Sequence, residues 1–237
     1  MGLRINTNIS SLAAMRQLAN TKGALDGSLE RLSSGSRINR AGDDAAGLAI
    51  SENLRAQIRR FRQAKRNAQD GVSMIQVSEG SLNELQNMII RLRELAIQAA
   101  SDTIGDKERS FTDREFQALK SEMQRMSDSI SFNGTPLLNG KAGVFEIQVG
   151  IYNNPMADRI VYNAENANVT LEALGLVGES VATKVGAQTT LAALDDSLMR
   201  VNSVRADMGA MQNRLQSTMN SLAIQDANLS AANNRIR

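Results

Sequence analysis

Residues 194–236 read LDDSLMRVNSVRADMGAMQNRLQSTMNSLAIQDANLSAANNRI, and their pattern indicates the fold more clearly than any other segment. Within this stretch an apolar side chain recurs every seven residues without exception. Seven residues are close to two helical turns, so these side chains share one face of a helix. Six consecutive seven-residue steps indicate a helix that packs along a partner helix. The helix-seam residues are Leu194, Val201, Met208, Leu215, Leu222, Leu229 and Ile236.

The partner helix is predicted over residues 44–100, which contain no proline. Asp43 and Asp44 occupy the positions of an N-cap and a first-turn acid. At about 1.5 Å per residue this helix is about 85 Å long, which favours an elongated bundle over a compact domain. Its apolar seam, widened by a second stripe in the later half, comprises Leu54, Ile58, Phe61, Ala68, Val72, Ile75, Leu82, Ile89 and Ala96.

A separate N-terminal helix is predicted over residues 8–32, before a break of small and polar residues at 33–42. Gly23 and Gly27 each weaken it by about 1 kcal/mol relative to alanine, so we expect it to depend on partners for its order. The inner-core seam of this helix contains Leu12, Leu18, Leu25 and Leu32.

The middle of the chain combines a shorter helix, over residues 108–129, with a β-hairpin near residues 144–162. Apolar and polar residues alternate from 144 to 149, and residues 159–162 form the return strand. Asn-Gly pairs at 133–134 and 139–140 are turn signals, and residues 171–186 are expected to be loop with a short helical turn. The predicted fold class is therefore mainly α: an elongated bundle of long antiparallel helices with coiled-coil seams, plus one small β-hairpin region.

The composition argues against an enzyme. The chain of 237 residues contains no His and no Cys, so the usual zinc sites, thiol nucleophiles and histidine acid–base pairs cannot be built. A carboxylate-based hydrolase is the remaining enzyme alternative, but no acidic pair stands in a pocket-forming context. We predict a structural protein with no catalytic residue, no cofactor and no metal site.

Membrane and nucleic-acid partners are not predicted either. No apolar run approaches the roughly 20 residues that span a bilayer, and the N-terminus has neither the apolar core of a cleaved signal nor a myristoylation motif, since Asn6 replaces Ser or Thr. The basic run Arg55, Arg59, Arg60, Arg62, Lys65 and Arg66 lacks interleaved aromatics. This run is expected to face solvent or an acidic patch on a neighbouring subunit.

Two segments carry a resemblance to a known family that is more specific than a coiled-coil pattern. Residues 32–50, LSSGSRINRAGDDAAGLAI, resemble the N-terminal signature of bacterial flagellins, and residues 200–215, RVNSVRADMGAMQNRL, resemble their C-terminal counterpart. Residues 91–98, RLRELAIQ, and 132–134, FNG, are similar to further family landmarks. The resemblances are gap-free, in the family's order, and cover most of the chain.

This resemblance implies a subunit that the flagellar type III apparatus exports unfolded and that polymerises beneath a cap into a hollow extracellular filament, a helical propeller. Residues 1–32 would belong to its inner core, 33–43 to a spoke, and 44–237 to a rod-like domain with the hairpin. Expected partners are other flagellin subunits, the export apparatus, and cap and junction proteins. The hypervariable outer domains of larger flagellins are absent. Family members continue about 40 residues past the position of Arg237, so we expect either a truncated chain or an unusual variant.

The resemblance also implies one recognition site. Flagellins sensed by the vertebrate Toll-like flagellin receptor present an arginine and a leucine on the first rod helix and a glutamate on the next. The matching positions are Arg91, Leu95 and Glu115. The alternative is that this row serves only subunit packing.

Two further readings predict different assemblies. A hook–filament junction protein shares the terminal helices and the export route, although its residues at 32–50 would be less similar to flagellin. A coiled-coil adaptor that binds a partner helix would form a small closed oligomer instead of an open polymer.

Overall fold

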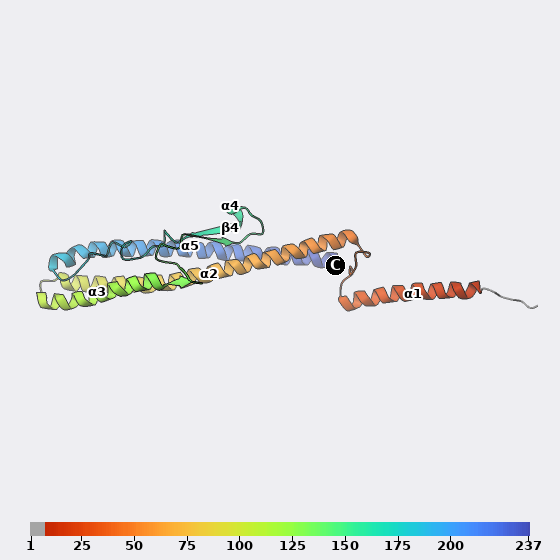
Figure 1. Ribbon diagram of the computed structural model, residues 1–237, viewed down its shortest axis with the longest axis horizontal. Coiled ribbons are helices and arrows are strands. Elements are labelled where there is room, and N and C mark those ends of the chain that lie inside the picture. The colour runs from red at the N-terminus through yellow and green to blue at the C-terminus, as the bar shows by residue number, and fades with distance from the viewer. Residues whose placement is uncertain (1–7) are drawn as a thin grey trace, which may run out of the picture. The chain divides into compact units, whose positions relative to one another are not determined.

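The computed structural model describes residues 8–237. Residues 1–7, which carry the N-terminal features considered above, lie outside the described residues. The elements are α1 (Ile9–Ser34), α2 (Ala45–Ala100), α3 (Asp106–Ser129), β1 (Ser131–Phe132), β2 (Thr135–Pro136), β3 (Val144–Gln148), α4 (Pro155–Asp158), β4 (Arg159–Asn163) and α5 (Lys184–Ile236) (Figure 1). The predicted fold class, mainly helical with a small hairpin, is confirmed.

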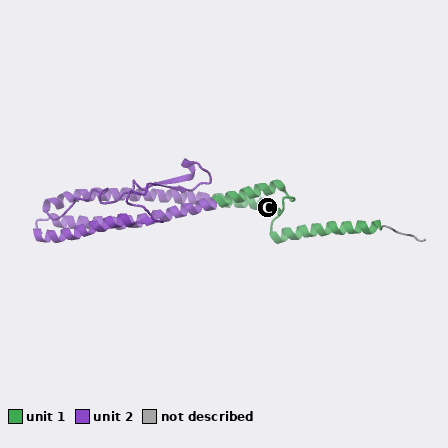
Figure 2. Cartoon of the chain, viewed as in Figure 1, with its two compact units in different colours: residues 1–60, 224–237 green, residues 61–223 purple. Residues whose placement is uncertain are grey.

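The chain divides into two compact units (Figure 2). Unit 1 comprises residues 1–60 and 224–237, and unit 2 comprises residues 61–223. Both long helices, α2 and α5, contribute residues to each unit. The assignment of segments 1–32, 33–43 and 44–237 to the inner core, spoke and rod of a filament stays a prediction.

In unit 2, α2, α3 and α5 run side by side, with α2 antiparallel to the other two (Figure 1). The contacts between α2 and α5 show the antiparallel direction, because residue numbers fall along α2 as they rise along α5. Arg93 of α2 pairs with Asp195 of α5 at 2.7 Å, and Arg205 of α5 donates a hydrogen bond to Gln86 of α2. Arg91 of α2 likewise reaches Glu115 of α3. Since the heptad face of α5 runs back along α2, the predicted partner helix is the observed one.

The heptad face of α5 is buried along its length in unit 2. Leu194, Val201 and Leu215 have no exposed surface, and Met208 and Leu222 are nearly as buried. Leu229 and Ile236, which belong to unit 1, are half-buried. The core of unit 2 includes the second stripe of α2 and the apolar face of α3, where Phe116 and Met123 are buried.

At Gly71, α2 lies close to both the hairpin and α5. A β-carbon at this position would lie 2.7 Å from Cδ1 of Ile147 and 3.3 Å from Cδ1 of Leu215. The α2 helix is continuous through Gly47, Gly71 and Gly80. At Gly71 the missing side chain lets β3 and α5 pack closely against α2.

The hairpin pairs β3 with β4 antiparallel, with Val144 opposite Asn163 and Gln148 opposite Arg159. A second, smaller pair, β1 with β2, surrounds the Asn133-Gly134 turn, where both residues have positive φ, 50° and 79°. Positive φ at both central positions is the requirement of a type I′ two-residue hairpin turn. The first Asn-Gly signal therefore closes a hairpin that the sequence predicted only as a turn.

Several element ends differ from the predictions. Asp44 alone is the N-cap of α2: its Oδ1 accepts a hydrogen bond from the Gly47 amide at 2.8 Å. Asp43, which the sequence analysis also placed at the start of this helix, lies before the N-cap and outside α2. The α5 helix begins at Lys184, inside the segment expected to be loop. Thr183 supports this earlier start, because its Oγ1 accepts a hydrogen bond from the Gly186 amide at 3.1 Å.

Candidate assembly and recognition surfaces

The apolar face of α1 is exposed throughout. Asn8 caps the helix by accepting the Ser11 amide, and Gly35 ends it in the left-handed conformation, but no residue of α1 is buried. The inner-core seam predicted from the sequence is 43% exposed at Leu12, 71% at Leu18, 57% at Leu25 and 81% at Leu32. Met15 and Leu29 extend this face and are also exposed. Such a contiguous apolar face is typical of a surface that another helix covers.

The segment between α1 and α2 is held by Asp43. Its carboxylate accepts hydrogen bonds from the Asn39 and Arg40 amides, both at 3.1 Å, and pairs with Arg31 at 3.4 Å. The Arg40 amide, the Asn39 amide and the nearby Arg31 lower the pKa of Asp43 below its usual value. Ile38 is fully buried, so this predicted break is a structured connection.

Arg91 and Glu115 lie together on the surface of unit 2. The guanidinium of Arg91 bonds Glu115 at 2.8 Å and Glu94 at 2.9 Å, and hydrogen bonds to Glu94 and Glu115 raise its pKa. Leu95 does not join them: it is 2% exposed and belongs to the core of unit 2. The structure therefore brings two of the three predicted recognition residues into one accessible cluster, while Leu95 supports the helix beneath them.

Part of the basic run on α2 is matched by local acceptors. Arg55 pairs with Glu52 at 2.7 Å, and Arg66 bonds the amide oxygen of Gln63 one helical turn away. Arg59, Arg60 and Lys65 are exposed on the helix surface. The structure contains one chain, so the predicted acidic patch on a neighbouring subunit stays a prediction.

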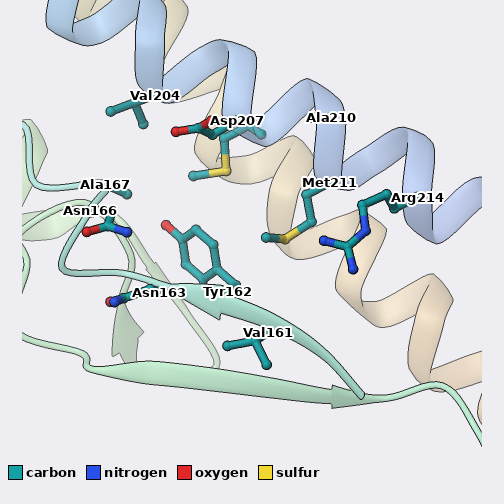
Figure 3. Close-up of a pocket in the computed structure, with 11 residues that line it drawn as sticks. Val161, Tyr162, Asn163, Asn166, Ala167, Val204, Asp207, Ala210, Met211 and Arg214 are labelled. Carbon is teal, nitrogen blue, oxygen red and sulfur yellow. The ribbon is translucent and has the colours of Figure 1, made fainter. Parts of the chain in front are cut away.

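A hollow of about 360 Å³ lies between β4, the following loop and α5 (Figure 3). Met208 and Met211 of α5 line it together with Tyr162 of β4. Asp207 and Arg214, about two turns apart on the same side of α5, also line it. Tyr162 is 4% exposed, and its hydroxyl donates to the Leu137 carbonyl oxygen at 3.1 Å. Burial raises the pKa of Tyr162 well above its ordinary value of 10.0.

This pKa shift predicts a loss of stability in alkali. A raised folded-state pKa means that stability is fully present below about pH 10, where the unfolded phenol titrates, and falls as pH rises further. The chain has two Tyr and no Trp. In a Tyr152→Phe variant, the phenol absorbance of the folded protein is therefore expected to titrate well above pH 10, and urea should return it to about 10. A folded-state titration at the unfolded value would contradict the burial of this side chain.

Two buried cations were not found from the sequence. Arg109 of α3 is 7% exposed and donates to the carbonyl oxygens of Ala99 and Ser101, both at 2.8 Å. Lys120 is 4% exposed and donates to the Glu179 carbonyl at 2.7 Å. Burial lowers the pKa of Lys120. Both cations hydrogen-bond to carbonyl oxygens of connecting segments and so hold these segments against α3. No local sequence pattern predicts the burial of either residue.

Two further features concern membrane spans and metal sites. None of the helices in residues 8–237 is both long enough and apolar enough for a membrane span. Across the same residues, acidic side chains nowhere gather in the groups of three that could bind a metal ion.

The chain matches family profiles at both ends. The bacterial flagellin N-terminal helical region matches residues 5–142, and the bacterial flagellin C-terminal helical region matches residues 191–237. Flagellin of Halalkalibacterium halodurans is 40% identical over 235 residues, covering 98% of this chain and 85% of the relative. Flagellin of Bacillus subtilis is 39% identical, covering 99% and 87%.

Solved structures agree with the sequence relatives. The crystal structure of Bacillus cereus flagellin aligns with a TM-score of 0.59 at 27% identity, over 71% of this chain and 94% of that one. A flagellar hook-associated protein from Vibrio parahaemolyticus aligns with a TM-score of 0.67 over 82% of this chain and 99% of that one. At 15% identity the second likeness concerns the fold alone. From its two terminal regions, its relatives and its fold, the chain belongs to the bacterial flagellin family.

Proposed function

We propose that this chain, a structural subunit of the flagellar filament by its family, assembles with copies of itself through the exposed apolar face of α1. The observation that carries the proposal is a helix of 26 residues with none of them buried. Covering one leucine of this face contributes about 1.5–3 kcal/mol. A contact that joins different surfaces of identical copies without closing on itself produces a helical polymer.

The alternatives receive less support. Relatives covering 98% of this chain include a flagellar filament core protein of Treponema maltophilum at 40% identity. Likeness to the hook-associated protein rests on fold at 15% identity, so a junction protein is not favoured. A closed coiled-coil adaptor would have to bury the α1 face in a small oligomer, which the assembly experiment distinguishes.

Assembly is tested by electron microscopy of the purified chain added to sheared filament seeds. The Leu18→Asp/Leu25→Asp double variant is expected to raise the critical concentration for seed elongation at least about 100-fold. Each substitution replaces a leucine that assembly would bury, at a cost of at least about 1.5 kcal/mol, and each 1.4 kcal/mol is tenfold. Asn20→Asp places a negative charge on the opposite side of α1 and should leave elongation unchanged. Elongation by the double variant at the wild-type concentration, or small closed oligomers of the wild type, would refute the proposal.

The route to the filament is part of the proposal. Export by the flagellar apparatus, capping of the growing end and an extracellular location are supported by membership of the family, whose relatives include flagellar filament proteins. To check this, the culture medium is assayed for the chain. We expect to find it there only when the cells have an intact flagellar export apparatus.

Recognition of the free subunit by the Toll-like flagellin receptor is a second candidate function. The exposed pair of Arg91 and Glu115 favours it, since both side chains are about half accessible. Arg91→Ala and Glu115→Ala are each expected to weaken receptor activation by monomer about 10-fold or more, as loss of a charged interface residue costs about 2 kcal/mol. Arg93→Ala is the matched control, because Arg93 is similarly exposed but pairs with Asp195 of α5. Equal activation by all three variants would assign the cluster to packing alone.

A further inference from the structure

Two Asn-Gly pairs lie in one short segment of unit 2, at residues 133–134 and 139–140. Asparagine followed by glycine is chemically labile, because glycine has no side chain to hinder attack by its backbone nitrogen on the asparagine amide. In an unfolded chain the two pairs are equivalent. The fold, however, places them in different environments.

Asn133 occupies the exposed tip of the β1–β2 turn. It is the one residue other than glycine with positive φ in residues 8–237, and Gly134 beside it is also exposed. Among the described residues, neither the Asn133 side chain nor the Gly134 amide has a hydrogen-bond partner. Strands of two residues each hold this turn, so it opens at little cost and the backbone can rotate toward the reactive geometry.

Asn139 lies in a closed environment. It is 9% exposed, and its Oδ1 accepts the Lys141 amide at 3.0 Å. Gly140 packs closely against Asn168: a β-carbon added to Gly140 would lie 2.8 Å from Nδ2 of Asn168. The flanking Leu138 carbonyl accepts the Val169 amide at 3.0 Å. Rotation at Asn139 therefore requires these contacts to break together.

We propose that Asn133 is a site of spontaneous deamidation in the folded chain and that Asn139 is protected. The Gly134 backbone nitrogen loses its proton and attacks Cγ of Asn133, forming the new N–C bond of a five-membered imide. The Cγ–N bond of the side-chain amide breaks, and the departing nitrogen leaves as ammonia. Water then adds to either carbonyl of the imide, giving aspartate or isoaspartate, with no change in oxidation state.

The product changes the charge of a defined hollow. Asn133 lines a hollow of about 390 Å³ together with Asp70 of α2 and Glu146 of β3. Deamidation adds a third carboxylate to this surface, and the isoaspartyl form also lengthens the backbone of the two-residue turn by one atom. Conversion therefore creates a subunit with a more negative surface between α2 and the two hairpins.

The test incubates the folded chain in mildly alkaline buffer and follows residues 126–141, a single tryptic peptide that contains both pairs. Fragment ions locate the one-dalton mass increase at either asparagine. We expect conversion at Asn133 at least about 10-fold faster than at Asn139 in the folded chain, and similar rates at both in urea, since 1.4 kcal/mol of opening free energy is tenfold. Equal rates in the folded chain, or reaction of both only in urea, would overturn the proposal.

A variant separates the chemistry from the fold. Asn133→Gly keeps a residue that tolerates positive φ in the turn and removes the amide. It is expected to abolish the conversion while leaving the slow rate at Asn139 unchanged. A faster Asn139 reaction in this variant would show that the turn protects the second pair, and would contradict independent control of the two sites.

Discussion

Replacement of Leu215 by alanine is expected to lower the free energy of unfolding of unit 2 by about 3–5 kcal/mol, the upper part of the range for buried leucines. Leu215 has no exposed surface, and its Cδ1 faces the space above Gly71 of α2. The cost of a cavity depends on how well its walls can collapse. Gly71 has no side chain to move into the space, so we expect little relief.

Urea unfolding followed by circular dichroism checks this prediction, and the midpoint temperature should fall by roughly 6–20 °C. Leu215→Met conserves volume and should cost less than about 1.5 kcal/mol. Gln216→Ala changes the exposed neighbour on the same helix and should lie within about 0.5 kcal/mol of the parent. A loss below about 1 kcal/mol for Leu215→Ala would mean that this heptad position does not carry the packing that its burial indicates.

Replacement of Arg109 by methionine is expected to cost about 2–4 kcal/mol, because charged hydrogen bonds contribute more than neutral ones. The last turn of α2 contains no basic residue of its own. Arg109 supplies that cation from α3, donating to the carbonyl oxygens of Ala99 and Ser101, while Asp106 pairs with it at 2.8 Å. Its loss leaves the carbonyl end of α2 without these donors.

Hydrogen exchange of the amides around residues 97–110, alongside urea unfolding, locates the effect. Arg109→Lys should recover only part of the loss, because an ammonium group lacks the planar fork that reaches three acceptors. Arg125→Met removes an exposed arginine paired with Glu122 on the same helix and should change stability by less than about 1 kcal/mol. Equal effects of the Arg109 and Arg125 replacements would show that burial of Arg109 is energetically unimportant.

The long helices could be predicted because their signal is local and repeated. The heptad series of α5 and the seam of α2 each extend over many turns, and every turn adds the same evidence for one buried face. The β3–β4 hairpin could be predicted for a similar reason, since its residues change from a helical period to alternation. Element ends were less accurate: Asp43 and Asp44 are adjacent acids, and only backbone geometry decides which one caps α2.

The candidate surfaces were also predicted in part from the sequence. The apolar face of α1 could be read from spacing, and the resemblance supplied Arg91 and Glu115 as neighbours on adjacent helices. Leu95 was assigned to that surface, but it lies in the core, because a residue four positions from Arg91 is turned by 40° around the helix and α2 is covered along that side.

The four long helices, their apolar faces and the family of the chain could be predicted from the sequence alone. These properties depend on side-chain period and on ordered motifs, which exist before the chain folds. Three features emerge only in the folded chain: Arg109 reaches the end of α2, Ile147 and Leu215 pack over Gly71, and one of two identical Asn-Gly pairs is exposed. Each of these depends on which segments distant in sequence meet, and packing geometry, not local pattern, settles that.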